Sequence, residues 1–183
     1  MSSSGVKHEG FTLWLTGMSG AGKSTISDEL MARFRAGGAK VELLDGDIVR
    51  TNLSQGLGFS REDRDTNVRR IGFVAELLSR NGVIVVVAAI SPYRATRDEV
   101  KARIANFVEV HVDCPIEVLA ARDVKGLYKR ALAGEVGNFT GISDPYEPPV
   151  DATVVVRSDR ETVGESVDKI WRELERRGLV SAS

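Results

Sequence analysis

Residues 17–25, with the sequence GMSGAGKST, combine closely spaced glycines with a lysine and two hydroxyl side chains. They follow the apolar residues 11–15 and precede residues 26–34, whose apolar side chains recur at helical spacing. The glycines let the backbone curl without Cβ clashes, so several N–H groups can point at one anion on a helix N-terminus. The lysine would reach the β- and γ-phosphates, and the first hydroxyl after it would ligate Mg²⁺. The stretch therefore predicts a nucleotide phosphate site, rather than an empty glycine turn, formed by Gly17, Met18, Ser19, Gly20, Ala21, Gly22, Lys23, Ser24 and Thr25.

Two carboxylates, Asp45 and Asp47, follow the short apolar stretch 40–44. At the end of a parallel strand they would lie at the edge where open α/β sheets bind ligands. The alternative is a simple turn, because Asp and Gly favour turns. Residues 83–90 form an apolar run that ends in Ser91 without an aspartate, whereas Mg²⁺ normally needs a nearby carboxylate. This need favours Asp45 and Asp47 as site residues, with Ser24 and Asp45 as the metal ligands.

The elements that must position these residues alternate along the chain. Apolar runs predict strands at residues 11–15, 40–44, 83–90, 107–112 and 152–156, and helical spacing predicts helices between them. We expect Ser60 and Asp63 to cap one helix, and the closing helix 161–177 to bury Val163, Val167, Ile170 and Leu174. The pattern predicts an α/β P-loop kinase fold with a five-stranded parallel sheet and helices on both faces.

Two segments allow more than one interpretation. The polar residues 61–67 are typical of a solvated helix start, although Arg64 and Asn67 share one helical face. Residues 122–149 are rich in glycine, proline and basic side chains and predict a long irregular segment. Such a segment inside a compact domain is typical of an active-site lid, which would exclude water from the phosphates. A passive surface loop is the alternative. His111 and Cys114 fit structural roles better than ligand roles.

Length and charge limit the classes of function. The 183 residues fit one domain, predicted at 11–180 after a flexible lead at 1–10. A net charge of −1 leaves no broad basic face, so we expect a small-molecule substrate and no nucleic acid. The single cysteine and the absence of a long apolar run favour a cytoplasmic protein without membrane association.

Six blocks together resemble the adenylylsulfate (APS) kinase family: residues 17–25, 44–50, 58–64, 90–94, 125–129 and 139–142. The resemblance extends over about residues 9–178. It implies transfer of the γ-phosphoryl group of ATP to the 3′-hydroxyl of adenosine 5′-phosphosulfate, in sulfate assimilation. ATP and Mg²⁺ are the implied cofactors, and a homodimer is the implied assembly.

The resemblance also implies roles for individual residues. Phe59 and Phe139 would enclose the adenine of APS, and the remaining acceptor residues would be Asp47, Arg50, Arg64, Asn67, Ile90, Ser91, Lys125 and Asn138. Arg122 lies where related kinases stack an arginine on the ATP adenine, the alternative being a surface arginine.

The catalytic residues expected on these grounds are Lys23, Asp47, Asp45 and Ser91. Asp47 would accept the proton of the 3′-hydroxyl and Asp45 would support Mg²⁺, although the two could exchange roles. The family resemblance carries a phosphoserine intermediate at Ser91, but direct in-line transfer between two bound nucleotides requires no such step.

Two other functions compete with this one. Another small-molecule P-loop kinase, acting on a nucleoside or a sugar, would explain the glycine loop and the lid but not the phenylalanine and arginine blocks. A non-catalytic nucleotide sensor is expected to lose the glycine loop or its lysine, and both are present here.

Overall fold

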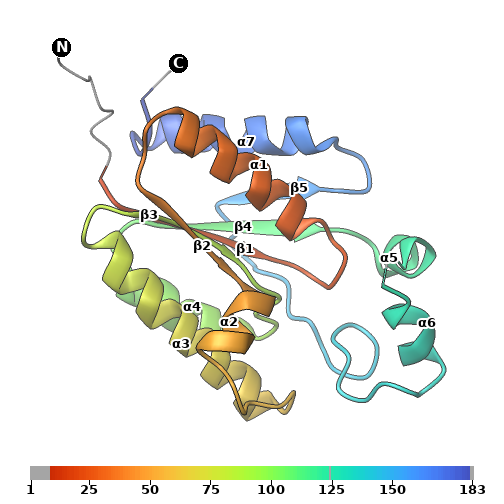
Figure 1. Cartoon of the computed structure of the whole chain (residues 1–183). Helices are drawn as coiled ribbons and strands as arrows, with labels where there is room; N and C mark the ends of the chain where they lie inside the picture. The colour runs from red at the N-terminus through yellow and green to blue at the C-terminus, as the bar shows by residue number, and fades with distance from the viewer. Residues whose placement is uncertain (1–8, 124, 182–183) are drawn as a thin grey trace.

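A computed structural model describes residues 9–123 and 125–181, and Figure 1 shows their arrangement. The strands are β1 (Thr12–Thr16), β2 (Val41–Asp45), β3 (Ile84–Ala88), β4 (Phe107–Asp113) and β5 (Val154–Arg157). The helices are α1 (Lys23–Ala36), α2 (Gly46–Asn52), α3 (Arg61–Ser79), α4 (Arg94–Arg103), α5 (Ile116–Arg122), α6 (Leu127–Leu132) and α7 (Val163–Arg176). The expected lead at residues 1–10 lies largely outside the described residues.

The strands form one parallel sheet in the order β2-β3-β1-β4-β5. The central strand β1 and its neighbour β3 are buried along their whole length, as expected for apolar runs covered on both faces. The predicted five-stranded parallel sheet with helices on both faces is therefore confirmed. Because β1 and β3 are neighbours, the glycine loop after β1 lies beside the chain that follows β3.

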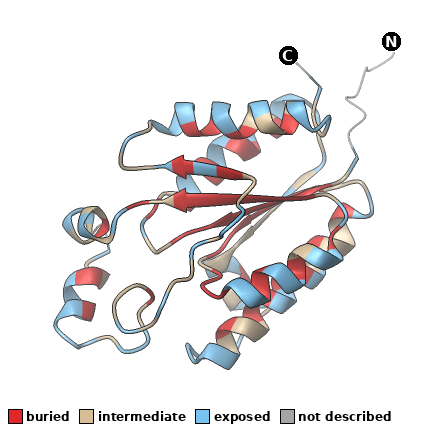
Figure 2. Ribbon diagram, turned by 180° about the vertical axis from the view of Figure 1, so that it is seen from behind, coloured by how far each residue is buried: buried red, intermediate tan, exposed pale blue. Residues whose placement is uncertain are grey.

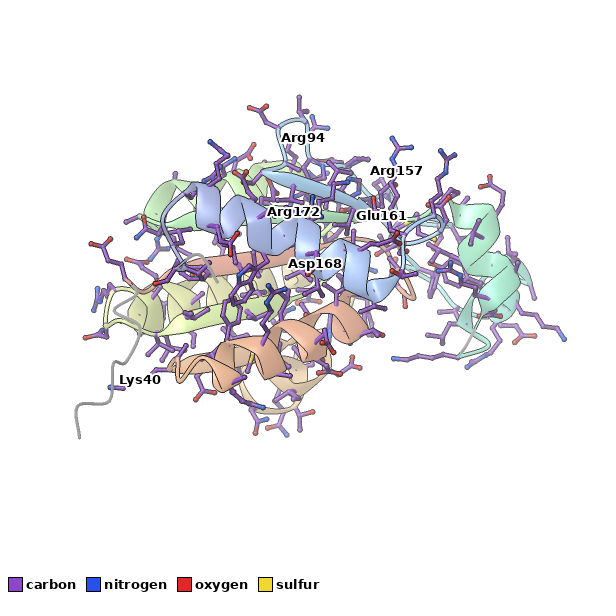
Figure 3. All side chains as sticks on the ribbon, turned by 90° about the horizontal axis from the view of Figure 1, so that it is seen from above. Lys40, Arg94, Arg157, Glu161, Asp168 and Arg172 are labelled. Carbon is purple, nitrogen blue, oxygen red and sulfur yellow. The ribbon has the colours of Figure 1, made fainter. Side chains whose placement is uncertain are left out.

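Two apolar cores lie on opposite faces of the sheet. One joins the sheet to α1 and α7 and includes Phe11, Leu30 and Ile170, and the other joins it to α3 and α4 and includes Trp14, Ile71 and Val100. Figure 2 shows the buried strands between the two helical layers. The layer of α1 and α7 is also tied at its surface, where Asp168 of α7, labelled in Figure 3, pairs with Arg33 of α1 at 2.9 Å.

Two local expectations were wrong. Residues 122–149 are not irregular throughout, because α5 ends at Arg122 and α6 follows soon after. Val163 does not face the core: it is the first residue of α7, directly after the capping residue Thr162, and is 38% exposed. Of the two interpretations of the start of α3, the fully solvated one does not hold: Arg64 and Asn67 are both buried, and Ser60 caps the helix as expected.

No helix within residues 9–123 and 125–181 is long and apolar enough to cross a membrane.

Candidate active site

The glycine loop connects β1 to α1 at the carboxyl edge of the sheet. Gly20 and Gly22 have φ angles of 76° and 102°, which side chains with a Cβ rarely adopt. Gly17 passes so close to β4 that a Cβ there would lie 2.4 Å from the carbonyl oxygen of Val112. These glycines therefore allow the curled backbone that a phosphate-binding loop requires.

Lys23, the first residue of α1, is folded over the loop. Its Nζ donates to the carbonyl oxygens of Gly17 at 2.7 Å and Met18 at 2.8 Å. Burial disfavours the charged amine and lowers the pKa of Lys23 to about 8, although the nearby carboxylate of Asp45 opposes the shift. The loop thus holds a cation that burial has stripped of water, which is a favourable arrangement for binding phosphate.

Asp45 is held between the two motifs. Its Oδ2 accepts a hydrogen bond of 3.1 Å from the Ser24 hydroxyl, and its Oδ1 accepts one of 2.9 Å from the backbone N–H of Asp47. The Asp47 side chain is exposed and lies 3.7 Å from the ammonium group of Lys125. The hydroxyl of Ser24 and the carboxylate of Asp45 are hard oxygen ligands in contact with each other, so the pair fits Mg²⁺. Within the described residues no group of three or more acidic, histidine or cysteine side chains could hold a metal.

Ser91 follows β3 in a left-handed conformation, with φ at 40°. Its hydroxyl accepts a 3.0 Å hydrogen bond from the indole of Trp14, and its carbonyl oxygen accepts one of 2.6 Å from Arg97. Ser91 is only 3% exposed. A non-glycine residue in this conformation is held there by its surroundings, and such residues cluster at functional sites.

Arg64 ties α3 to the segment after α6. Its guanidinium donates to the carbonyl oxygens of Phe59 and Asn138, to the hydroxyl of Thr140 at 2.5 Å, and to the carboxylate of Asp144 at 3.3 Å. Four of its five N–H groups are therefore used within the protein.

Asn67, one turn further along α3, is buried. Its Oδ1 has no hydrogen-bond partner among the described residues. A buried acceptor without a partner is costly, and Asn67 lines the cavity described below, so its Oδ1 is available to a hydrogen-bond donor that enters there.

Two phenylalanines lie near these polar groups. Phe59 is 55% exposed, and the guanidinium of Arg50 covers its ring at 4.4 Å. Burial and the neighbouring Arg64 lower the pKa of Arg50. Phe139 is partly buried and meets the ring of Tyr128 edge to face, with 5.0 Å between the ring centres. Both phenylalanines offer a face for stacking.

One cavity of about 360 Å³ brings most of the predicted residues together. Of the predicted residues, those lining it are Ser19, Gly20, Lys23, Ser24, Asp45, Asp47, Arg50, Phe59, Arg64, Asn67, Ile90, Ser91, Lys125, Asn138 and Phe139. Gly17, Met18, Ala21, Gly22 and Thr25 belong to the glycine loop and its helix but are not among the lining residues. Arg122 is also outside the lining, is exposed, and donates to the carbonyl oxygen of Ser158 at 2.9 Å.

The sequence interpretation missed several residues that shape this cavity. Thr140 lines the cavity and accepts a hydrogen bond from Arg64. Tyr128 packs against the lining residue Phe139, and Arg97 donates to the carbonyl oxygen of the lining residue Ser91. Tyr128 and Thr140 stand within two of the blocks quoted above, which was the available signal, but their partners are far away in sequence. His111 and Cys114 are buried and outside this lining, and the structural roles expected for them stay predictions.

The comparisons with known proteins agree with one another. Residues 9–157 match the model of the adenylylsulphate kinase family. The adenylyl-sulfate kinase of Rippkaea orientalis is 62% identical over 176 residues, which cover 96% of this chain and 97% of that protein. The adenylyl-sulfate kinase of Microcystis aeruginosa is 61% identical over 175 residues, which cover 96% of this chain and 97% of that protein.

A solved structure gives the same answer. The Mycobacterium tuberculosis APS kinase in complex with AMPPNP and APS superposes with a TM-score of 0.87 at 37% identity, covering 92% of this chain and 99% of that chain. Together with the glycine loop, the parallel sheet and the cavity, these likenesses show that the chain is a kinase that belongs to the adenylylsulfate kinase family.

Proposed function

We propose that this protein transfers the γ-phosphoryl group of ATP to the 3′-hydroxyl of adenosine 5′-phosphosulfate, giving 3′-phosphoadenosine 5′-phosphosulfate and ADP. The observation that carries the proposal is the shared cavity, in which Lys23 and Ser24 of the glycine loop face the same space as Phe59 and Phe139. Phosphoryl transfer requires mainly positioning and neutralisation of charge, and this cavity offers groups for both.

The glycine loop and Lys23 would bind the triphosphate of ATP. Lys23 would exchange its two carbonyl contacts for phosphate oxygens as ATP enters. Ser24 and Asp45 would hold Mg²⁺, whose charge neutralises the phosphate oxygens when it is bound. Arg122 would stack on the adenine only after leaving its contact with Ser158, so its role is the least supported of the donor residues.

The other half of the cavity would bind APS. Stacking of the adenine on Phe59 and Phe139 is worth about 1–3 kcal/mol per base by analogy with nucleic-acid binding. The Arg50 guanidinium that covers Phe59 would have to move aside, which would free it for the phosphosulfate group. The unpartnered Oδ1 of Asn67 would accept from a hydroxyl of the ribose.

The remaining acceptor residues divide between two roles. Arg64 has one N–H left for the ligand, so we assign it chiefly to holding the residues around Asn138 in place. The other lining residues, Ile90, Ser91, Lys125 and Asn138, would complete the APS pocket.

The environments of the two carboxylates favour distinct roles. Asp45 is already engaged by Ser24 and by a backbone N–H, which suits a metal ligand of fixed position. Asp47 is exposed apart from its contact with Lys125, so it would orient the 3′-hydroxyl and accept its proton. The buried hydroxyl of Ser91 is held by Trp14, which favours direct transfer over a phosphoserine intermediate.

We further propose a cytoplasmic homodimer that acts on this small molecule and not on nucleic acid. The net charge of −1 supports the second point, because phosphate backbones are bound by basic surfaces. Light scattering on the purified protein would give the number of copies directly.

Release of ADP in a coupled assay tests the reaction. With ATP, Mg²⁺ and APS we expect turnover that depends on APS and yields product equal to the ADP formed. When nucleosides or sugars replace APS in the assay, little ADP should form. Faster turnover with one of these compounds would favour another small-molecule kinase, and binding of both nucleotides without ADP would favour a sensor.

A further inference from the structure

Tyr128 is a buried residue of α6 that does not line the cavity, yet it contacts both halves of it. The side chain is 3% exposed and belongs to the core cluster beside α1. Its hydroxyl group and its ring face different partners, so the two parts of the side chain can be considered separately.

The hydroxyl reaches the glycine loop. Tyr128 Oη donates a 2.7 Å hydrogen bond to the carbonyl oxygen of Ser19, which lines the cavity on the donor side. Because a carbonyl oxygen only accepts, the phenol must keep its proton to make this bond. Burial raises the pKa of Tyr128 to about 12, so the proton is present throughout the physiological range.

The ring reaches the acceptor side. It meets Phe139 edge to face at an interplanar angle of 79°, which is a favourable aromatic geometry. The backbone N–H of Phe139 donates to the Ser143 hydroxyl at 2.7 Å. Phe139 is therefore held by its own turn on one side and by Tyr128 on the other.

The position of Tyr128 is itself fixed. Asp123 caps α6, because its two carboxylate oxygens accept from the backbone N–H groups of Tyr128 at 2.9 Å and Lys129 at 3.0 Å. A second contact joins the same parts of the chain. Gly141 lies so close to Met18 of the glycine loop that a Cβ there would be 2.7 Å from the Met18 sulfur.

From these contacts we propose that Tyr128 is a positioning residue that couples the two nucleotide sites, by linking the Ser19 carbonyl of the glycine loop to the Phe139 wall of the acceptor pocket. The inference rests on the proposed function, since it assigns ATP to the loop and APS to the wall. When phosphates occupy the loop, they fix the position of Ser19. Ser19 then holds Tyr128 through its hydrogen bond, and the ring of Tyr128 holds Phe139. Coupling of this kind is reciprocal, so each nucleotide should tighten the binding of the other by the same factor.

The test measures binding of APS by calorimetry with and without the non-hydrolysable analogue AMPPNP and Mg²⁺. In the unaltered protein we expect AMPPNP to tighten APS binding. In Tyr128→Phe, which keeps the ring, the tightening should fall by about three- to ten-fold, the size expected for one neutral hydrogen bond. Its affinity for APS alone should stay within about two-fold, because Phe139 keeps its aromatic support.

Tyr128→Leu removes the ring as well, and should weaken APS binding alone by about two- to ten-fold. Tyr146→Phe is the matched control, since it removes another phenol hydrogen bond, the part-buried 3.0 Å contact with Thr16, which involves neither Ser19 nor Phe139 although its two partners lie within seven residues of them. It should lower the melting temperature about as much as Tyr128→Phe but keep the coupling.

Two results would overturn the inference: no coupling in the unaltered protein, or coupling in Tyr128→Phe equal to that of Tyr146→Phe. Failure of the proposed function would look different, because the unaltered protein would then release no ADP with APS whatever the binding data show.

Discussion

At the scale of single residues, the environment of Lys23 differs from that of an ordinary, solvent-exposed lysine. It is buried against two carbonyl oxygens, and its pKa is lowered because burial outweighs the attraction of Asp45. The charged form is therefore less stable in the folded chain than in water. That cost would be recovered when phosphate oxygens replace the carbonyl groups, which makes Lys23 a residue for binding rather than for stability.

Replacement of this lysine tests that division. Lys23→Met should reduce turnover by at least about 100-fold, since a preorganised charge on the transferred phosphoryl group is lost. The free energy of unfolding without nucleotide should not fall at pH 7. The pKa of Lys23 is lower in the folded chain than in the unfolded chain, so its charged amine lowers the free energy of unfolding. This destabilisation is fully present below about pH 8 and disappears as the pH rises through 10.5. Denaturant unfolding and the ADP assay measure the two effects, and a large loss of stability would contradict the assignment.

The pH dependence of ATP capture follows from the same pKa. We expect kcat/KM for ATP to fall as the pH rises through about 8, because the free protein then loses the charge of Lys23. Lys23→Arg stays charged at this pH, so the fall should vanish in that variant at whatever activity remains. An unchanged profile in the arginine variant would assign the fall to another group.

Substitution of Ser91 distinguishes direct transfer from a phosphoserine intermediate. Its hydroxyl is held by Trp14, while its left-handed backbone conformation is held through Arg97. Ser91→Ala should therefore keep turnover within about ten-fold, and Ser91→Gly, which relieves the backbone strain, should keep at least as much. Complete loss of turnover in both variants, with ATP and APS still bound, would contradict direct transfer.

At the scale of elements, contacts along its length tie the part of the chain between α5 and β5 to the rest of the fold, and three of them come from different elements. Tyr128 contacts the glycine loop, Arg64 of α3 binds the turn around Thr140, and Arg97 of α4 donates to the carbonyl oxygen of Glu147 at 2.6 Å. These contacts place the segment over the carboxyl edge of the sheet, as a lid would require. Its opening and closing remain a prediction.

Two glycines of this segment provide a matched test of the contact between the segment and the glycine loop. Gly141 and Gly134 both have positive φ angles, 92° and 75°, but only Gly141 packs against Met18. Gly134→Ala should cost about 1 kcal/mol through backbone strain alone and leave KM for ATP unchanged.

Gly141→Ala should lower the unfolding free energy further and raise KM for ATP several-fold, since Met18 must move to make room. Thermal unfolding and steady-state kinetics measure both. Equal effects of the two substitutions on KM would mean that this contact does not influence the loop.

Local patterns predicted most of the elements but not all of their ends. Apolar periodicity is a local signal, so it located the strands and the long helices, and Ser60 identified the start of α3. The short helix α6 was missed because its cap comes from Asp123 across a glycine turn, not from a recognised capping motif. The exposure of Val163 was missed because periodicity gives the face of a helix but not where its contact with the core begins.

At the scale of the whole molecule, the sheet order explains why distant motifs meet. The loops after β1, β2 and β3 leave from neighbouring strands at one edge, so residues 17–25, 45–47 and 91 come together without further assumptions. The sequence therefore predicted the lining of the cavity well. It could not predict the burial of Arg64 and Asn67, which depends on Asn138, Thr140 and Asp144 folding back over α3.

The central claim is that the terminal phosphates of ATP and the APS molecule meet in one cavity, with the 3′-oxygen of APS facing the terminal phosphorus of ATP. A crystal structure of this protein with AMPPNP, Mg²⁺ and APS tests it most directly. We predict AMPPNP on the glycine loop, APS between Phe59 and Phe139, and about 3–3.5 Å between the acceptor oxygen and the phosphorus. A single adenosine-sized pocket, or an APS ribose turned away from the terminal phosphorus, would contradict the account.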